Sequence, residues 1–404
     1  MRVAIYSQDG FGLGHLRRTS SIADGLLRAR HDATVLAVCD SPVDQLFGPT
    51  QRYDRLKLPT VVKRAPGRWA AVALGDDVSD VLRLRSALLR TALVTYLPDL
   101  VLVDHMPHGA MGELVDGLDA LRAVQPDARI VLGLRDIIDA PEVVRTRWMA
   151  EGAYDALERL YDRVLVYGSP DVYDVVDEYG FSAMVRARTR YCGYVVEARH
   201  AVDREAVRRA LMPGLEPERP LVVVMGGSGH DAAPMMACAA ACATALGTSG
   251  RWATVIVCGP NMPAGARREL AAQLPATSGR VLSSVESSAG VLAAADAVVS
   301  MAGYNTTMEV LASGTPAVLI PRRGPSVEQR TRARLFADRG WVQTVDPDDL
   351  SPATLGAALR TALSGGPVPA QRDRGPDLGG LGAAVTELLA LADDRQVAAV
   401  AAPG

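Results

Sequence analysis

The fold is decided by the stretch Val298-Val-Ser-Met-Ala-Gly-Tyr-Asn-Thr-Thr-Met-Glu-Val-Leu-Ala-Ser-Gly-Thr-Pro-Ala-Val-Leu-Ile-Pro321. Its β-branched start and its apolar end predict two strands, with a glycine-bearing turn, a helix and a Gly-Thr-Pro turn between them. Because Gly303 has no Cβ, we expect the backbone to turn tightly there and a ligand to approach closely. We expect Asn305 or Thr306 to cap the helix. The pattern predicts a strand–helix–strand unit of a parallel sheet.

The start of this helix is a predicted nucleotide site. A helix N-terminus offers unpaired N–H groups and a partial positive charge, which bind anions such as phosphates. Glu309 lies three residues after Thr306, so its carboxylate can accept hydrogen bonds from a ribose diol. Nucleotides lie across the carboxyl ends of parallel strands. The predicted binding residues are therefore Gly303, Tyr304, Asn305, Thr306 and Glu309.

The same residues resemble the donor-binding stretch of GT-B glycosyltransferases of family 28, which includes the peptidoglycan N-acetylglucosaminyltransferase that makes lipid II. In that family a Gly-x-x-Thr-x-x-Glu run is followed, past a proline, by two glutamines. Gly303, Thr306 and Glu309 match the run, and Glu328-Gln329 follows Pro321, so glutamate replaces the first glutamine. The resemblance implies an α/β fold of two Rossmann-like domains facing across a cleft, the first for the acceptor and the second for a nucleotide sugar.

Length and composition exclude several classes of protein. The chain has 404 residues and a formal net charge of −3, which suits two domains and argues against a nucleic-acid partner. We find no apolar run long enough to cross a membrane and no signal-peptide pattern. The five cysteines are scattered, as in a cytoplasmic protein with reduced thiols. We expect a cytoplasmic protein without a transmembrane segment; peripheral membrane contact and the oligomeric state stay open.

Strands alternate with helices along the whole chain, which predicts α/β layers around parallel sheets. We expect an acceptor-binding Rossmann-like domain over 1–200, a linker over 201–220 with a hinge at Pro217–Pro220, and a donor-binding Rossmann-like domain over 221–370. Over 371–404 we expect a helix that packs back toward the first domain, and a disordered tail. The expected strands are 2–6, 34–39, 100–103, 129–134, 163–167, 221–225, 254–258, 280–282 and 297–301; the expected helices are 16–28, 80–93, 170–179, 203–211, 232–246, 264–273 and 381–391.

A glycine-rich loop, Gly10-Phe-Gly-Leu-Gly14, separates the first strand from the first helix. It is a weak dinucleotide fingerprint, because the GxGxxG ending is absent. Its glycines allow a sharp turn that places His15 at the helix N-terminus. Gly14 is also predicted to contact the nucleotide-sugar donor. A neutral imidazole there can accept a proton from an acceptor hydroxyl, and the helix terminus disfavours imidazolium. Inverting GT-B enzymes often carry such a loop and histidine, so His15 is our candidate base; a helix cap or phosphate ligand is the alternative.

A second candidate follows the predicted strand 100–103. That strand ends in Asp104, at the sheet edge where His15 is expected. A carboxylate bonded to one ring nitrogen fixes the tautomer of a histidine and stabilises the imidazolium that forms. In similar plant-type and antibiotic glycosyltransferases an aspartate after this strand orients the catalytic histidine, and Asp104 is our candidate for that role. His105 and His108 either contact the acceptor or belong to a polar loop.

A second glycine-rich turn, Gly226 to His230, follows the predicted strand 221–225. Its backbone N–H groups and the Ser228 hydroxyl can wrap a diphosphate, with Gly227 and Gly229 allowing close approach. It resembles the Gly-Gly-Ser turn of family 28. In some relatives an arginine after an earlier Gly-x-Pro turn also binds the diphosphate, and the matching stretch 193–197 has none. The missing charge can come from His230, Arg322 or Arg323.

No metal site is predicted. Asp76-Asp77 precedes a predicted helix and reads as its N-cap and dipole partner. Cys238 and Cys242 lie on an alanine-rich helix without nearby histidine or cysteine partners and read as buried small residues. We therefore expect a metal-independent reaction, in which backbone amides and a helix dipole stabilise the charge of the leaving group.

The favoured hypothesis is an inverting glycosyltransferase. His15 takes a proton from the acceptor, and the nucleoside diphosphate, UDP as the expected one, leaves into the loops of Ser228 and Thr306. We expect Val285 against the base and Glu328 and Gln329 at the sugar hydroxyls. The expected acceptor is a small natural product, with the mixed stretch Val61–Trp69 as a mobile lid over it.

Three alternatives stay open. The acceptor can be lipid-linked or belong to the cell envelope, with Val61–Trp69 as a basic and apolar membrane patch. The same fold also carries nucleotide-sugar 2-epimerases, although few acidic and histidine residues converge in the expected cleft. A protein that binds nucleotide sugars without turnover is the third alternative. No cofactor is expected besides the nucleotide-sugar co-substrate.

Overall fold

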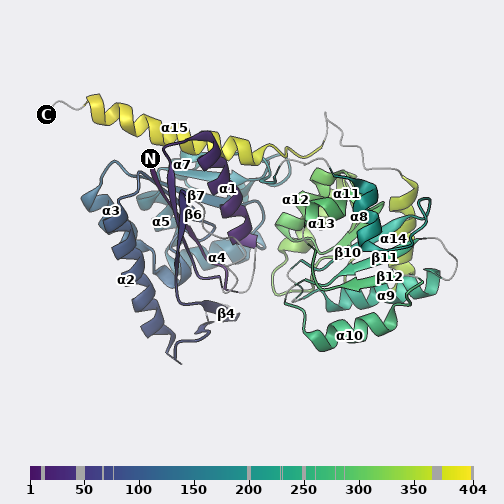
Figure 1. The fold of residues 1–404 in the computed structure, drawn as a ribbon. Coiled ribbons are helices and arrows are strands. Elements are labelled where there is room, and N and C mark those ends of the chain that lie inside the picture. The colour runs from purple at the N-terminus through teal and green to yellow at the C-terminus, as the bar shows by residue number, and fades with distance from the viewer. Residues whose placement is uncertain are drawn as a thin grey trace. The chain divides into compact units, whose positions relative to one another are not determined.

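The structure, a computed structural model, describes residues 1–10, 14–41, 51–65, 68–75, 77–197, 202–227, 229, 231–247, 252–259, 261–277, 279–285, 287–365 and 375–401. It divides into two compact units, shown in Figure 1. Unit 1 comprises Met1–Val195 and Asp377–Gly404, and unit 2 comprises Val196–Pro376. The chain thus leaves unit 1 at Val195, and the hinge expected at Pro217–Pro220 is wrong, because that segment lies within unit 2.

Unit 1 is built on a sheet whose described strands are all parallel, in the order β3-β2-β1-β6-β7-β8-β9. Apart from exposed Arg2, every residue of the central strands β1 and β6 is buried, as a parallel sheet between helices requires. The strands are β1 (Arg2–Ser7), β2 (Thr34–Cys39), β3 (Tyr53–Lys57), β6 (Leu100–Asp104), β7 (Arg129–Arg135), β8 (Arg163–Tyr167) and β9 (Thr189–Tyr191).

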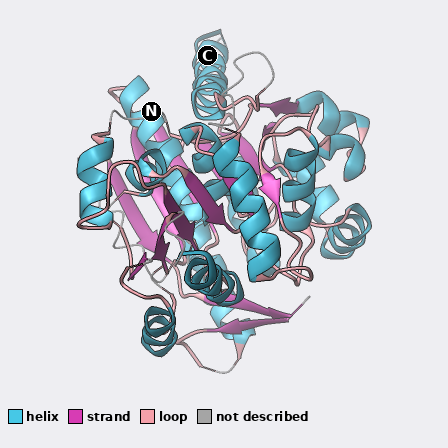
Figure 2. Ribbon diagram, turned by 90° about the vertical axis from the view of Figure 1, so that its right-hand side faces the viewer, coloured by secondary structure: helices cyan, strands magenta, loops and turns pink. Residues whose placement is uncertain are grey.

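Helices cover both faces of this sheet, as Figures 1 and 2 show. Right-handed crossovers place α1 and α3 on opposite faces, because the strand order runs in opposite directions from β1 and from β6. Helix α15 packs on α1, where a Cβ at Gly25 would lie 2.7 Å from a methyl group of Val385. The helices are α1 (Gly14–Ala29), α2 (Val78–Tyr96), a 3₁₀ turn (Ala110–Gly112), α3 (Val115–Val124), α4 (Pro141–Glu151), α5 (Ala153–Leu160), α6 (Val175–Glu178), α7 (Ala183–Arg188) and α15 (Gly380–Ala401).

Two segments of unit 1 have a secondary structure that the sequence did not predict. The stretch Val61–Trp69, expected as a mobile lid, belongs to an antiparallel hairpin, β4 (Val61–Ala65) and β5 (Arg68–Ala71). Val61 and Val62 are fully buried, and this burial anchors the hairpin. The expected helix 170–179 forms only over α6, which begins after its N-cap Asp174.

Unit 2 has its own described sheet, all parallel, in the order β12-β11-β10-β13-β14-β15. The strand order reverses between β10 and β13, so their carboxyl ends form a topological switch point, the usual place for a ligand. The sequence Leu-Val-Val-Val-Met of β10 is buried throughout. The strands are β10 (Leu221–Met225), β11 (Ala253–Val257), β12 (Gly279–Leu282), β13 (Ala297–Ser300), β14 (Ala317–Leu319) and β15 (Gln343–Thr344).

The expected linker 201–220 is largely structured. It contains α8, which packs on α11 within unit 2, because Arg208 bonds Asp296 at 2.7 Å. On the other face α9 packs on α10 and α14. The helices are α8 (Arg204–Leu211), α9 (Ala233–Gly247), α10 (Ala264–Gln273), α11 (Ser288–Ala294), α12 (Tyr304–Ser313), α13 (Glu328–Asp338) and α14 (Pro352–Ser364). Over the described residues of both units, no helix combines the length and apolarity needed to cross a membrane.

Candidate active site

His15 and Asp104 meet at the carboxyl edge of the unit 1 sheet. Helix α1 begins at Gly14, so His15 lies in its first turn, and Asp104 is the last residue of β6. Nδ1 of His15 lies 2.5 Å from Oδ2 of Asp104, whose side chain is fully buried. An ionised carboxylate only accepts hydrogen bonds, so a neutral His15 ring in this contact has its proton on Nδ1 and its lone pair on Nε2. The pair therefore has the geometry of a base and its orienting carboxylate.

Arg18 is the partner of Asp104 that the sequence reasoning missed. It lies one turn after His15, and its Nη2 donates to both oxygens of Asp104, at 2.9 Å and 2.7 Å. Burial alone would raise the pKa of Asp104, but Arg18 and His15 lower it to about 2. The spacing of Arg18 from His15 at i and i+3 on one helix face was a usable signal. Asp104 therefore stays ionised beneath His15.

A second buried carboxylate supports the backbone of His15. Oδ1 of Asp9 accepts from the His15 backbone N–H at 3.1 Å, and the Asp9 backbone N–H donates to Asp40 at 2.6 Å. Burial, together with Asp104 and Asp40, raises the pKa of Asp9 to about 6, although His15 acts in the opposite direction. Among described residues Oδ2 of Asp9 has no hydrogen-bond partner.

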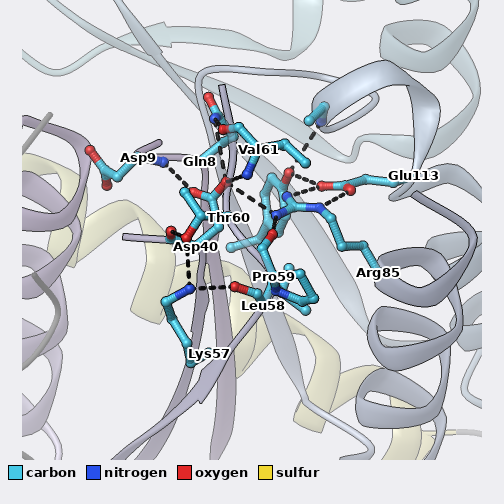
Figure 3. Close-up of polar contacts among 12 residues, drawn as sticks. Gln8, Asp9, Asp40, Lys57, Leu58, Pro59, Thr60, Val61, Arg85 and Glu113 are labelled. Carbon is cyan, nitrogen blue, oxygen red and sulfur yellow. Dashed lines mark hydrogen bonds and ion pairs between the residues drawn. The ribbon is translucent and has the colours of Figure 1, made fainter. Parts of the chain in front are cut away.

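Figure 3 shows how Asp40 connects this chain of contacts to the neighbouring elements. Arg85, fully buried on α2, bonds Asp40 at 3.1 Å and forms a two-pronged ion pair with Glu113. The Tyr6 hydroxyl donates to Glu113 at 2.6 Å, and the Val61 N–H donates to Asp40 at 3.3 Å. The network ties the hairpin, α2 and the end of β1 to the loop that carries Asp9.

His105 and His108 take different positions near this edge. The ring of His105 lies 5.2 Å from the ring of His15, because its left-handed φ of 73° turns the chain at the end of β6. Burial and Arg135 hold the pKa of His105 well below its ordinary value. His108 is buried, and its Nε2 lies 3.6 Å from Glu151. Of the two, His105 is the one beside the candidate base.

The glycine-rich turn after β10 occupies the switch point of unit 2. Gly227 has φ of 59° and Gly229 has φ of 91°, a backbone region that favours glycine. A Cβ at Gly229 would lie 2.5 Å from the carbonyl oxygen of Cys258, and one at Gly227 would lie 3.9 Å from Oγ1 of Thr306. The turn therefore faces the start of α12. Ser228 and His230 lie outside the described residues.

Helix α12 begins at Tyr304, and its N-cap is Gly303 without any side-chain cap. The expected caps, Asn305 and Thr306, are wrong, since both lie inside the first turn. Gly303 has φ of −67°, so no left-handed turn requires glycine there. Among the described residues, the nearest atom to a Cβ at Gly303 would be the side-chain amide nitrogen of Gln329, at 4.0 Å. The space beside the helix N-terminus is therefore open, as predicted.

Glu328 and Gln329 open α13 and already have protein partners. Arg332, fully buried, donates to Oε1 of Glu328 at 3.0 Å and to the carbonyl oxygen of Ala302 at 2.9 Å. Oε1 of Gln329 accepts from the Arg322 backbone N–H at 3.1 Å. The glutamate that replaces a family glutamine thus pairs with an arginine one turn later, which the i, i+4 spacing could have indicated. That Glu328 and Gln329 contact the hydroxyl groups of the donor sugar stays a prediction.

The other predicted donor residues lie at the same sheet edge. Asn305, Thr306 and Glu309 are half-buried on α12, and Val285 is half-buried before α11. The ring of Tyr304 is buried, with the Arg332 guanidinium 5.6 Å from its centre, so Tyr304 offers a ligand its backbone. Asp77 caps α2 as expected, accepting from the Ser79 N–H at 2.8 Å; Asp76 lies outside the described residues. The described residues contain no cluster of histidine, cysteine and acidic side chains suited to a metal ion.

Comparisons with known proteins agree with this architecture. Residues 221–383 match the glycosyltransferase family 28 C-terminal domain. The UDP-N-acetylglucosamine–N-acetylmuramyl-(pentapeptide) pyrophosphoryl-undecaprenol N-acetylglucosamine transferase of Paenarthrobacter aurescens is 33% identical over 171 residues, 41% of this chain and 42% of the relative. The enzyme of the same name from Leuconostoc mesenteroides is 31% identical over 150 residues, 37% of this chain and 39% of the relative. The alignments thus span about two fifths of these relatives.

Solved structures resemble the chain over nearly its full length. The calicheamicin glycosyltransferase CalG4 has a TM-score of 0.61 at 18% identity, over 97% of this chain and 98% of its own. MurG of Acinetobacter baumannii has a TM-score of 0.62 at 16% identity, over 96% of this chain and 100% of its own. At this identity the likeness establishes the fold, which is that of both neighbours.

Proposed function

We propose that this chain, whose residues 221–383 match the glycosyltransferase family 28 C-terminal domain and whose fold is that of solved glycosyltransferases, transfers a sugar from a nucleoside-diphosphate sugar, UDP being the expected nucleotide, with inversion at the anomeric carbon. The observation that carries the proposal is the buried Asp104 bonded to Nδ1 of His15 at 2.5 Å. This contact leaves Nε2 as the proton acceptor of a general base. On unit 2, the turn after β10 and the start of α12 supply the backbone donors for a diphosphate.

The proposed mechanism assigns one task to each group. Nε2 of His15 removes the proton of the acceptor nucleophile as the nucleophile attacks the anomeric carbon. The bond from that carbon to the distal phosphate breaks, and the nucleoside diphosphate leaves. Asp104, kept ionised by Arg18, stabilises the imidazolium that forms. Glu309 holds the ribose, and the amides at Gly227 and the first turn of α12 stabilise the charge on the leaving diphosphate.

For the acceptor we propose a small natural product, with a lipid-linked acceptor as the second candidate. The second candidate is favoured by the names of the curated relatives, which act on pyrophosphoryl-undecaprenol. The family match, however, covers residues 221–376 of unit 2 and only residues 377–383 of unit 1. The acceptor preference of those relatives therefore does not transfer with it. The expected cytoplasmic location stays a prediction.

The test is a variant that removes the base and leaves the donor site intact. We expect His15→Ala to lower turnover by about a hundredfold and to leave UDP affinity unchanged. His31→Ala, at an exposed position, is the matched control and keeps wild-type turnover. The assay uses UDP-, dTDP-, GDP- and ADP-sugars with phenolic, aminosugar and polyprenyl-diphosphate acceptors. Wild-type turnover in His15→Ala with any acceptor removes the proposed role.

The same assay separates the alternatives. Interconversion of sugar epimers without transfer indicates a 2-epimerase, and donor binding without transfer or hydrolysis indicates a binding protein. Metal independence is a further part of the proposal, because the charge of the leaving group is assigned to backbone amides and the α12 dipole. Full activity in excess EDTA is expected. Activity that is lost with the chelator and restored by Mg²⁺ or Mn²⁺ contradicts this part.

A further inference from the structure

Unit 2 contains a cavity of about 470 Å³ at the carboxyl ends of β13 and β14. Its wall is apolar and includes Met235, Met301 and Ile320, whereas Asp231, Arg322 and Arg323 bring charge to it. The volume is in the range of small-molecule sites. Two arginines follow each other along this lining, and their surroundings differ.

Arg323 is already engaged at the surface. Its side chain is 72% exposed and pairs with Asp348 at 3.2 Å, and its Nη2 donates to the carbonyl oxygen of Pro347 at 3.0 Å. A guanidinium that is solvated and paired in this way gains little from a further anion. Arg323 is therefore a poor candidate for the charge that binds a phosphate.

Arg322 is different, because its guanidinium has charged neighbours but no hydrogen bond to any of the described residues. Its Nη1 lies 3.7 Å from Oδ2 of Asp231, and its Nη2 lies 3.9 Å from Oε2 of Glu328. Both separations exceed hydrogen-bond distance. The side chain is 27% exposed, and its Nε is buried without a partner among the described residues. A partly buried guanidinium without hydrogen bonds is unfavourable until oxygen acceptors reach it.

The backbone holds Arg322 at the predicted donor site. Its N–H donates to Oε1 of Gln329, and the amide nitrogen of Gln329 lies beside Gly303, the N-cap of α12. Asp231 belongs to the turn after β10, two residues beyond Gly229. The guanidinium thus stands between the turn that can wrap a diphosphate and the residues predicted to contact the sugar.

We propose that Arg322 binds the distal phosphate of the nucleoside-diphosphate donor, the phosphate that carries the sugar. This inference rests on the proposed function. Phosphoryl oxygens match the planar donor fork of arginine, which can form two parallel charge-assisted hydrogen bonds with them. Arg322 then replaces the family arginine that the stretch 193–197 lacks. Asp231 competes with the phosphate for the guanidinium and holds it in place while the site is empty.

Calorimetry on the full chain tests this assignment. The probe is whichever of UDP, dTDP, GDP and ADP binds the wild type most tightly, with its nucleoside monophosphate measured by competition. We expect Arg322→Gln to weaken binding of the diphosphate ten- to a hundredfold and to leave the monophosphate within twofold of wild type. Arg323→Gln is the matched control and keeps wild-type affinity for both. Unchanged Tm of the nucleotide-free variants shows that they are folded.

A second variant should change the affinity for the diphosphate in the opposite direction. Asp231→Asn removes the competing carboxylate, so binding of the diphosphate should tighten two- to fivefold, and this gain should disappear in the Asp231→Asn/Arg322→Gln double variant. Wild-type diphosphate affinity in Arg322→Gln, or equal losses for diphosphate and monophosphate, overturns the inference alone. A wild-type protein that binds none of the four diphosphates overturns the proposed function as well.

Discussion

Two buried aspartates beside His15 have opposite electrostatic environments. Asp104 faces Arg18 and the His15 ring, which lower its pKa to about 2 against the effect of burial. Asp9 has no cation bonded to its side chain in the described contacts, and burial raises its pKa to about 6. Ionised Asp104 therefore stabilises the folded state at neutral pH, whereas ionised Asp9 destabilises it. The two residues can be separated by experiment.

Asp9→Asn should stabilise the protein in a pH-dependent way. The folded pKa of Asp9 lies above its unfolded value of about 3.9, so its stabilising proton is bound below about pH 4 and lost as pH rises through about 6. At pH 8 the asparagine should raise the free energy of unfolding by about 2–3 kcal/mol, and at pH 4 by almost nothing. Urea unfolding at both pH values measures this. A larger gain at pH 4 than at pH 8 contradicts the assigned pKa; Asp104→Asn, which should destabilise at pH 8, gives the contrasting sign.

Glu309→Ala should weaken binding of the nucleoside diphosphate by about 1.5–3 kcal/mol, the scale of lost hydrogen bonds to a charged group. Glu309 is half-buried on α12, beyond the first turn that carries Thr306. Glu269→Ala, at an exposed position on α10, is the control. Calorimetry that finds equal affinities for the folded variant and the wild type would refute the ribose contact.

At the scale of elements, the hairpin β4–β5 and helix α2 depend on one buried arginine. Arg85→Met removes the cation shared by Asp40 and Glu113, and leaving buried carboxylates unpaired costs about 3–5 kcal/mol. Arg83→Met on the same helix is the control: its side chain is 73% exposed, so the expected change is within about 0.5 kcal/mol. Urea unfolding compares the two variants. A similar small loss in both would show that the network does not stabilise the fold.

The elements that the sequence predicts well are those with local causes. Strands β2, β8 and β10 have the expected bounds, because short buried runs of apolar residues identify them. The hairpin is missed because Lys63, Arg64 and the Pro66-Gly67 pair read in the sequence as a loop, while the burial of Val61 depends on distant residues. The buried position of Arg85 on α2 is missed for the same reason. Its partners Asp40 and Glu113 lie far away in sequence.

At the scale of the whole molecule, the candidate site also combines residues that the local sequence predicts with residues that depend on distant contacts. The sequence suggests His15, Asp104 and Glu309, because glycine turns and strand ends place them at sheet edges. For Arg18 and Arg332 the sequence offers only a helical spacing, and Arg322 is one of three candidates for the missing charge; their contacts identify their partners. Asp104, Glu113 and Glu328 each accept a hydrogen bond from an arginine side chain. The pairings of Asp104 and Glu113 join different elements, so the spacing of residues along the chain does not assign them.

Each unit has its own core, so changes at the C-terminus should affect one unit only. Helix α15 belongs to unit 1 and buries Ala384, Val385, Leu388, Leu391 and Ala392. A chain that ends at Pro376 should lose roughly 5 kcal/mol or more of unit 1 stability, from large apolar side chains worth about 1.5–3 kcal/mol each. Unit 2 should still bind UDP.

Thermal scans with and without UDP test this, because UDP stabilises only the unit that binds it. A chain that ends at Asp394 retains all five buried residues and is the matched control; it should unfold as the wild type does. We expect the Pro376 truncation to lower the transition of unit 1 and to preserve the shift that UDP causes in unit 2. Equal destabilisation of both transitions would show that the units do not unfold independently, and an unchanged unit 1 transition would show that the contact of α15 with α1 contributes nothing to stability.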